Sequence, residues 1–244
     1  MKKILLITGG SRGIGAATAL KASRNGYKVC INYVNNELAA TKIVELIKTE
    51  GGVATAIRGD VSSEADVIRM FEHVDRVYGK VDALVNNAGI LNRRAMVTDM
   101  SADAINRLLQ INITGSLLCA REAIKRMKDK GGAIVNVSSA AAKHGSPFEY
   151  VDYAASKGAI DTMTIGLAKE VACDNIRVNA VRPGIILTDI HESGGDPDRV
   201  ERLKDVIPLK RAGDAEEVAN AILWLLSDQA TYVTGSILDV SGGR

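Results

Sequence analysis

Seven short runs of apolar and β-branched residues, separated mostly by longer stretches of helical character, constrain the fold of this chain more than any other feature. The runs are KILLIT, KVCINY, VATAIR, DALVNN, AIVNVS, IRVNAV and SILDVS. Strands that are apolar along nearly their whole length are typical of a parallel sheet that helices cover on both faces. With right-handed crossovers, this alternation predicts an α/β fold with a doubly wound, seven-stranded parallel sheet. Its ligand crevice then lies at the carboxyl ends of the strands.

The sequence carries signals for helix ends, but we see none for a domain boundary. Ser62 or Ser63 precedes one helical stretch, Ser101 precedes another, and glycines follow their far ends. No internal repeat, low-complexity tract or linker rich in proline and serine interrupts the chain. We therefore expect a single domain over residues 1–244.

Composition excludes several classes of function. Hydrophobic residues at 46% and charged residues at 25% describe an ordinary globular protein with no membrane partner. A net charge of +2 without a dense run of lysine and arginine gives no electrostatic basis for binding nucleic acid. The three cysteines lack CxxC spacing, which argues against a disulfide framework and against a metal site, and favours a reducing, cytoplasmic location. The N-terminal MKKILLITGG is too short in its apolar run for a signal peptide and is read as the first strand.

A glycine-rich segment, TGGSRGIG, follows the first predicted strand. Gly9, Gly13 and Gly15 are spaced GxxxGxG, and a helix is expected to begin near Ile14. Glycines allow a close approach of the backbone, and a helix N-terminus offers free N–H groups to a pyrophosphate. The segment favours a dinucleotide site. A tight strand-to-helix turn without a ligand is the alternative.

Asn112 lies at a position where the helical pattern changes. It continues an apolar stripe that ends at Leu109, so the amide is either buried, where it needs partners, or at an exposed edge of the stripe. Gly115 and Ser116, both poor helix formers, follow within a turn. These residues favour a local distortion of the helix at Asn112.

Tyr153 and Lys157 lie four residues apart in YVDYAASKGAID, a stretch with ordinary helical character. Residues with this spacing share one face of a helix, so the phenol and the ammonium can reach the same small volume. Of the six tyrosines, only Tyr153 has a lysine four residues later.

Taken together in chain order, these features resemble the short-chain dehydrogenase/reductase family. The matching elements are TGGSRGIG, NNAG at 86–89, Asn112, Ser139, YAASK with Tyr153 and Lys157, and RPG at 182–184. The resemblance covers essentially the whole chain. Within the family, the chain is most similar to the branch of bacterial 3-oxoacyl carrier-protein reductases and glucose dehydrogenases. The resemblance implies a Rossmann fold and the interconversion of a carbonyl and an alcohol on a small molecule.

The resemblance also implies the catalytic roles. Tyr153 is the general acid for a developing alkoxide, and Ser139 binds the substrate oxygen. Lowering the pKa of a phenol from about 10 by about three units needs roughly 4 kcal/mol of preferential stabilisation of the phenolate. Lys157, helped by the oxidised nicotinamide, is the expected source, and it also holds the nicotinamide ribose. Asn112 holds a water molecule behind Lys157 for proton relay.

The loop between Ser139 and Tyr153 is expected to govern substrate choice. The interval is fourteen residues, one more than in the similar carrier-protein reductases. His144, Glu149 and Tyr150 either contact a substrate or are solvated.

Two positions indicate which dinucleotide binds. The second strand ends in Asn32 and Tyr33, where NAD-specific relatives carry an acid, and Arg12 matches a basic position that pairs with a 2′-phosphate. A solvated loop cation is the alternative for Arg12. We predict NADP(H), with NAD(H) as a weaker second.

The resemblance assigns a larger set of residues to cofactor binding, beside Tyr153 and Lys157. The set is Gly9, Ser11, Arg12, Gly13, Ile14, Gly15, Asn32, Tyr33, Asp60, Val61, Asn87, Ala88, Gly89, Pro183, Gly184, Ile185 and Thr188. A substrate lid is expected at about 189–208. Family members form homotetramers, which we expect here too.

Two other functions stay open. One is an NAD-linked sugar or polyol dehydrogenase, which differs in cofactor and direction. The other is a dinucleotide-binding sensor without catalysis, against which the complete set of Asn112, Ser139, Tyr153 and Lys157 argues.

Overall fold

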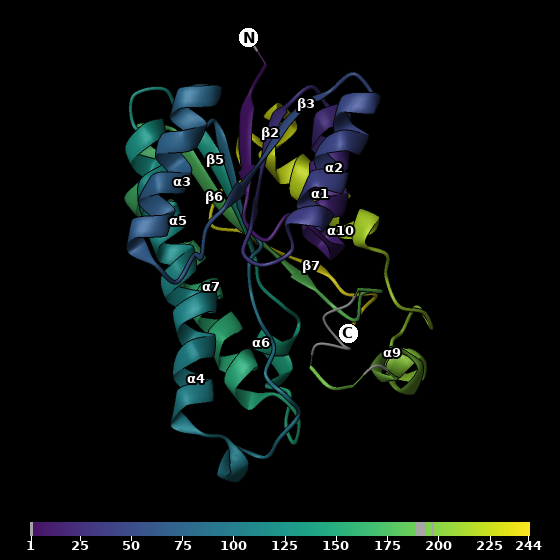
Figure 1. The fold of residues 1–244 in the computed structure, drawn as a ribbon. Helices are drawn as coiled ribbons and strands as arrows, with labels where there is room; N and C mark the ends of the chain where they lie inside the picture. The colour runs from purple at the N-terminus through teal and green to yellow at the C-terminus, as the bar shows by residue number, and fades with distance from the viewer. Residues whose placement is uncertain (1, 189–193, 197) are drawn as a thin grey trace.

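The computed structural model describes residues 2–188, 194–196 and 198–244 (Figure 1). Seven parallel strands form one sheet in the order β3-β2-β1-β4-β5-β6-β7, which confirms the doubly wound α/β fold. The strands are β1 Ile4–Ile7, β2 Lys28–Tyr33, β3 Val53–Arg58, β4 Ala83–Asn86, β5 Gly132–Val137, β6 Ile176–Pro183 and β7 Ile237–Val240. The bounds of β2 and β3 match the predicted runs, and those of the other strands differ from them by one or two residues at one or both ends.

Helices cover both faces of the sheet. Figure 1 shows α1, α2 and α10 on one side, and α3, α5 and α7 on the other. The main helices are α1 Gly13–Arg24, α2 Glu37–Thr49, α3 Glu64–Val77, α4 Ala102–Leu109, α5 Gly115–Met127, α6 Ala141–His144, α7 Val151–Glu170, α9 Arg199–Leu203 and α10 Ala215–Leu226. None of the helices in the described part of the chain is long and apolar enough to cross a bilayer.

The pleat of β1 shows how the apolar runs form two cores. Leu5 and Ile7 pack into the core under α1, α2 and α10, whereas Ile4 and Leu6 pack into the core under α3 and α5. Successive side chains of a strand point to opposite faces, so a strand buried on both faces must be apolar at every position. This is the physical reason for the continuous apolar runs in the sequence.

Two of the predicted helix starts are capped by serine side chains. Ser63 Oγ accepts a hydrogen bond from the Asp66 N–H at 3.3 Å, and Ser101 Oγ accepts one from the Ala104 N–H at 3.2 Å. Of the two candidates Ser62 and Ser63, the N-cap of α3 is therefore Ser63.

The predicted distortion at Asn112 is confirmed. Between α4 and α5 the chain forms a π-helical segment, Gln110–Thr114, and the Asn112 residue within it is 1% exposed. The buried alternative for Asn112 therefore holds. π-Helical segments occur frequently at functional sites, because the extra residue in the turn redirects a side chain.

The order of the strands places a crevice beside β1. β1 pairs with both β2 and β4, so the chain winds outward from β1 in both directions. Loops that leave neighbouring strands diverge there, which opens space at the carboxyl ends of β1 and β4.

Candidate functional site

A cavity of about 620 Å³ runs along the carboxyl ends of the strands. Residues that follow β1, β2, β3, β4, β5 and β6 line it, together with residues of α7 and α9. Most of the predicted site residues lie in its wall. Among those predicted to bind cofactor, Gly9, Ser11, Arg12, Gly13, Ile14, Tyr33, Asp60, Val61, Asn87, Ala88, Gly89, Pro183, Gly184, Ile185 and Thr188 do so.

The glycine-rich loop after β1 has a shape that other residues cannot take. Gly9 and Gly13 have positive φ angles of 61° and 52°, which side chains rarely allow. A Cβ on Gly15 would lie 2.5 Å from the Gly9 carbonyl oxygen and 2.6 Å from Asn87 Nδ2. Gly15 does not itself line the cavity, but it allows α1 to start beneath the loop. The first turn of α1 contains no acidic residue, so its positive dipole end faces the cavity uncompensated by a carboxylate of that turn.

Asn87 joins the loop after β4 to this glycine-rich loop. Its Nδ2 donates hydrogen bonds to the carbonyl oxygens of Thr8 and Gly9, both at 2.9 Å. Thr8 Oγ1 in turn accepts from the N–H groups of Asn87 and Ala88 at 3.0 Å. These bonds fix the two walls of the cavity against each other.

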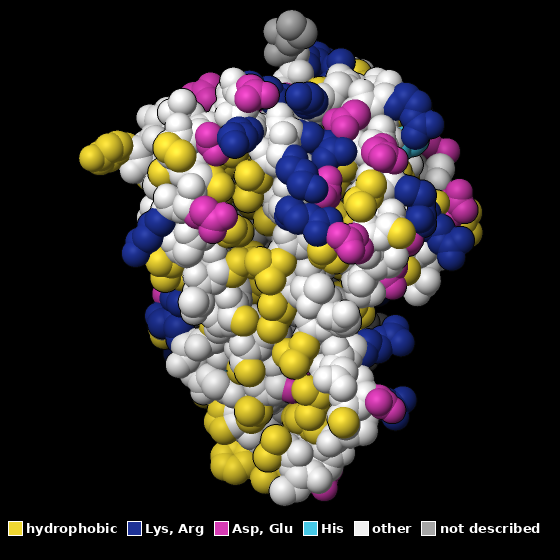
Figure 2. Space-filling model, turned by 90° about the vertical axis from the view of Figure 1, so that its left-hand side faces the viewer, with side chains coloured by type: hydrophobic (Ala, Val, Ile, Leu, Met, Phe, Trp, Pro, Cys, Tyr) yellow, Lys and Arg dark blue, Asp and Glu magenta, His cyan; other side chains and the backbone are white. Residues whose placement is uncertain are grey.

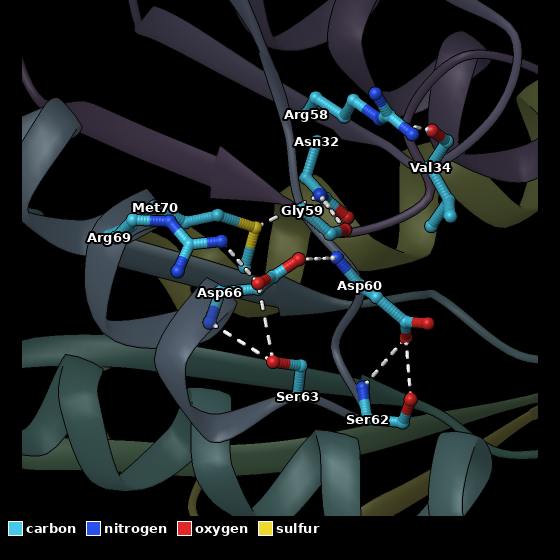
Figure 3. Close-up of polar contacts among 10 residues, drawn as sticks. All are labelled: Asn32, Val34, Arg58, Gly59, Asp60, Ser62, Ser63, Asp66, Arg69 and Met70. Carbon is cyan, nitrogen blue, oxygen red and sulfur yellow. Dashed lines mark hydrogen bonds and ion pairs between the residues drawn. The ribbon is translucent and has the colours of Figure 1, made fainter.

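Asn32, which was predicted to bind the cofactor, lies behind the cavity wall, and its contact with a cofactor stays a prediction. Asn32 is 1% exposed and does not line the cavity. Its side chain accepts a hydrogen bond from the Gly9 N–H at 3.2 Å. It also donates to the Gly59 carbonyl oxygen at 2.8 Å and to Met70 Sδ at 2.9 Å, as Figure 3 shows. Asn32 therefore holds the loops after β1 and β3 together from behind. Tyr33 is the residue of this pair that faces the cavity.

A carboxylate network shapes the wall after β3. Asp66, in the first turn of α3, accepts a hydrogen bond from the Asp60 N–H at 3.0 Å and forms an ion pair with Arg69 (Figure 3). The bond from Asp60, more than the Arg69 charge, lowers the pKa of Asp66. Asp60 Oδ1 accepts from the Ser62 N–H at 2.9 Å and from Ser62 Oγ at 2.7 Å. Asp60 and Val61 are thereby fixed where they line the cavity.

The wall after β2 bears directly on dinucleotide choice. Val34, Asn35, Asn36 and Ala39 line the cavity there, and sequence patterns had not singled them out. Asn36 caps α2 by accepting from the Ala39 N–H at 2.9 Å. Arg12 is exposed, and its side chain has no hydrogen-bond or ion-pair partner among the described residues. A cation and a helix N-terminus thus both border this end of the cavity.

At the other end of the cavity, Tyr153 and Lys157 lie one turn apart on α7. Lys157 Nζ is 5.5 Å from the centroid of the Tyr153 ring and donates a hydrogen bond to the Val137 carbonyl oxygen at 2.7 Å. Burial lowers the pKa of Lys157 to about 8, against a small opposing effect of the Asp161 charge. The predicted proximity of the two side chains is confirmed.

Burial raises the pKa of Tyr153, whereas a hydrogen bond with Ser139 and the charge of Arg199 lower it. The prediction from the sequence was that Lys157 lowers the pKa of Tyr153. In the structure the Lys157 ammonium is directed to the Val137 carbonyl oxygen, and Ser139 provides the larger lowering effect.

The two neighbouring serines after β5 have different roles. Ser138 is buried, and its Oγ donates to the Lys157 carbonyl oxygen at 3.2 Å. Ser139 is half-buried, and its Oγ accepts from the Ala141 N–H at 3.1 Å. Because Ser139 lines the cavity with Tyr153 and its side chain lowers the pKa of that phenol, Ser139 is the serine that can meet a substrate oxygen beside the phenol.

Asn112 lies behind the cavity wall, not in its lining. Its Oδ1 accepts from the Ile90 N–H at 2.8 Å, and its Nδ2 donates to the Ile90 carbonyl oxygen and to Ser156 Oγ, both at 3.1 Å. A Cβ built on Gly89 would lie 3.3 Å from Asn112 Oδ1 and 3.6 Å from Lys157 Nζ. Asn112 and Lys157 therefore approach the same small region beside Gly89. The water-holding role predicted for Asn112 stays a prediction.

The loop between Ser139 and Tyr153 contributes some of its candidates to the cavity. His144 and Tyr150 line it, whereas Glu149 lies outside and pairs with Arg199 and Arg202. Of the predicted lid, residues 189–193 and 197, with His191, lie outside the described residues. The described part of that segment includes α9, whose Arg199 lines the cavity.

Several cavity residues had no signal in the sequence. They are Leu91, Arg107, Ile111, Ser146, Arg199 and Arg244. Arg199 and Arg244 come from a short helix and from the last residue of the sequence. No local motif marks them, because only the tertiary fold brings them to the cavity that Tyr153 also lines.

The comparisons with known proteins agree with this geometry. A family model described as enoyl-(acyl carrier protein) reductase matches residues 9–244. The chain is 56% identical over 245 residues to the uncharacterized oxidoreductase YgfF of Escherichia coli, covering 99% of both proteins. It is 36% identical over 244 residues to 3-oxoacyl-(acyl-carrier-protein) reductase FabG of Staphylococcus epidermidis, covering 100% of this chain and 99% of the relative.

Solved structures with the same fold cover nearly the whole chain. One is a double mutant of a short-chain dehydrogenase/reductase from Serratia marcescens, with a TM-score of 0.93 and 31% identity, covering 99% of this chain and 97% of the other. Another is a blue fluorescent protein from a metagenomic library in complex with NADPH, with a TM-score of 0.91, 34% identity and the same coverage. The chain belongs to the short-chain dehydrogenase/reductase family and is an NAD(P)-dependent oxidoreductase.

Proposed function

We propose that the protein is an NADP(H)-dependent reductase that interconverts a carbonyl and an alcohol on a small molecule. The observation that carries the proposal is the arrangement of the cavity. Tyr153, Ser139 and Lys157 line one end of it, and the glycine-rich loop that leads into α1 lines the other end. A pyrophosphate can approach the backbone closely at Gly9, Gly13 and Gly15, which have no side chains. The first turn of α1 contains no acidic residue that would repel it. The residues present therefore fit a dinucleotide.

The side chains of this chain supply proton transfer and orientation. A bound nicotinamide supplies or accepts the hydride. Ser139 orients the substrate oxygen, and the Tyr153 hydroxyl delivers a proton to it as negative charge develops there. The half-buried Tyr153 remains protonated at neutral pH, because its pKa lies above the ordinary phenol value. The buried Lys157 ammonium stabilises the phenolate that forms during turnover.

The preference for NADP(H) rests on the wall after β2. The residues that line it offer no carboxylate to repel a 2′-phosphate, and the unpaired Arg12 guanidinium borders it. The relative that was solved in complex with NADPH also supports the preference.

One observation favours the alternative of an NAD-linked sugar or polyol dehydrogenase. Glu37 lies in the first turn of α2, and its charge, after burial, raises the pKa of the neighbouring Tyr33. A carboxylate near this wall disfavours a phosphate. The dissociation constants of NADPH and NADH decide between the two, and comparable constants would reject the NADP(H) preference.

The test of the reaction is consumption of NADPH with a panel of 3-oxoacyl thioesters, keto sugars, diketones and aromatic ketones, with Tyr153→Phe as the blank. Turnover that disappears in the variant supports the proposal. NADPH binding without any turnover would instead favour the oxidative role or the non-catalytic sensor.

We also propose a homotetramer that pairs α5 and α7 across a two-fold axis. Figure 2 shows hydrophobic side chains in a band along the centre of the face that carries these helices, with more of them at its lower end. Leu117 of α5 and Ile165 of α7 are exposed, and exposed apolar surface of this kind marks interfaces. Light scattering that gave a monomer would reject the assembly.

Two further features stay proposals. A lid at about 189–208 over the substrate fits the presence of Arg199 in the cavity wall. A cytoplasmic location fits the free state of the described cysteines, of which Cys30 and Cys119 are buried and Cys173 is exposed.

A further inference from the structure

Two arginines form an unusual part of the cavity wall near Tyr153. Arg199 of α9 is 7% exposed, and it lines the cavity together with Arg244. Its guanidinium carbon lies 4.5 Å from the centroid of the Tyr150 ring. A guanidinium that is stacked on an aromatic ring keeps the N–H groups at its edge available for a planar anion.

Both arginines have N–H groups without a partner. Arg199 Nε and Arg244 Nη1 are shielded from solvent, and neither has a hydrogen-bond partner among the described residues. Buried polar groups in folded proteins are nearly always hydrogen-bonded. Neither guanidinium is therefore saturated by hydrogen bonds within the described part of the chain, and each retains donor capacity at the cavity that it lines.

The charge of Arg199 is only partly balanced. Its Nη2 lies 3.1 Å from Glu149 Oε2, but Arg202 Nη2 lies 2.9 Å from Glu149 Oε1 and Arg94 Nε lies 3.9 Å from the same oxygen. One carboxylate thus serves three guanidinium groups. Asp196, the other acid of this group, pairs with Arg202.

Arg244 adds further positive charge. Burial, followed by the charge of Arg199, lowers the pKa of Arg244. Among the described residues that line the cavity, Asp60 has the only carboxylate side chain, and it follows β3. β3 lies at the far edge of the sheet from β5 and α7, so Asp60 does not compensate the arginines beside Tyr153.

We propose that Arg199 and Arg244 form a binding site for an oxyanion of the substrate, so that the protein reduces carbonyl compounds which carry a carboxylate or a phosphate. This inference rests on the proposed function and names its substrate class. The Arg199 charge acts on the Tyr153 phenol, which places the anion site next to the group that protonates the substrate oxygen. The carbonyl and the anion of one small molecule can then be held at the same time, and the anion fixes the orientation of the carbonyl toward Tyr153 and Ser139.

Steady-state kinetics with matched substrates test the site. Straight-chain oxo acids with one to four carbons between carbonyl and carboxylate are compared with their methyl esters, and hydroxyacetone phosphate is compared with hydroxyacetone. We expect kcat/KM for the best acid or phosphate to exceed that of its neutral partner at least tenfold, as a hydrogen bond between charged groups requires. Which of the two series shows the preference identifies the anion.

Variants assign the preference to these residues. Arg199→Met and, independently, Arg244→Met should bring the ratio of kcat/KM for charged and neutral partners close to one, whereas Arg199→Lys should restore part of it. Arg202→Met is the matched control, because Arg202 pairs with the same Glu149 but does not line the cavity. It should keep the ratio. A ratio near one in the unmodified protein, or a ratio that Arg199→Met and Arg244→Met leave unchanged, overturns the inference.

A binding measurement separates this inference from the proposed function. Calorimetric titration of the protein loaded with NADP⁺ uses 4-oxopentanoate and hydroxyacetone phosphate as probes. Saturable binding that weakens at least tenfold in Arg199→Met supports the anion site even if no carbonyl is reduced, which would reject the proposed function alone. Reduction of neutral ketones that depends on Tyr153, without binding or preference for either anion, rejects the anion site alone.

Discussion

Replacing Asn32 tests whether this residue supports the site or contacts the dinucleotide. In Asn32→Ala, the Gly9 N–H and the Gly59 carbonyl oxygen lose the partners that they have at 3.2 and 2.8 Å. Each buried polar group left without a partner costs about 1–3 kcal/mol, so the free energy of unfolding should fall by roughly 2–6 kcal/mol. For a chain of this size each kcal/mol corresponds to about 2–4 °C, which gives a fall in Tm of roughly 4–24 °C.

The assay is thermal unfolding at fixed protein concentration, combined with NADPH titration well below the transition. Asn35→Ala is the matched control, because Asn35 is exposed and lines the cavity. It should change Tm by no more than about 2 °C, as for most surface substitutions. An unchanged Tm in Asn32→Ala, together with a rise of more than tenfold in the Kd of NADPH, would refute the supporting role and restore the direct contact.

Three further predictions concern the catalytic end and the glycine-rich loop. Tyr153→Phe should lower kcat/KM for reduction by about 10²–10⁴-fold, the contribution of a general acid, while titration should show a Kd for NADPH within threefold of the original. The pKa of Lys157 is about 8 in the folded protein against 10.5 as the ordinary value, so the folded state binds fewer protons between these values and burial of the charge destabilises it below about pH 8. Lys157→Met removes this penalty, which amounts to roughly 3 kcal/mol. In urea unfolding, the stability of the variant relative to the unmodified protein should therefore be most favourable near pH 7 and should decline between pH 8 and 10.5. A stability difference that does not depend on pH would contradict the lowered pKa. Gly15→Ala should destabilise the fold by about 1–3 kcal/mol and weaken NADPH binding, because its Cβ would lie 2.5 Å from the Gly9 carbonyl oxygen. The control is Gly158→Ala, whose Cβ would have no atom within 4 Å. It should be neutral or stabilising in the same unfolding assay.

Local patterns were sufficient where physical causes are local. The strand runs, the serine caps and the break at Asn112 follow from burial on two faces, from unpaired N–H groups and from poor helix formers. Tyr153 and Lys157 were identified for the same reason, since their proximity depends only on the period of one helix.

Asn32 shows where local reasoning was insufficient. A residue at the end of a strand can turn its side chain toward the crevice or back into the fold, and the sequence of β2 does not distinguish the two. The choice depends on the Gly59 carbonyl oxygen and Met70 Sδ, which belong to later elements. Arg199 escaped prediction for a related reason, because its partners Tyr150 and Glu149 are about fifty residues distant in the sequence. Arg244 is more distant still from the residues beside which it lines the cavity.

The π-helical segment Gln110–Thr114 connects the two ends of the cavity. Within it, Asn112 holds Ile90 and Ser156, and thereby the start of α7 that carries Tyr153. Immediately after it, a Cβ on Gly115 would lie 2.7 Å from Val61 Cγ2, so only glycine lets α5 come this close to the wall after β3. A regular helix has one residue fewer per such turn and would direct the amide of residue 112 differently relative to Gly115. The same distortion thus supports the proposed catalytic side chains at one end and the proposed dinucleotide wall at the other, which gives a reason for the poor helix formers in the middle of an otherwise helical stretch.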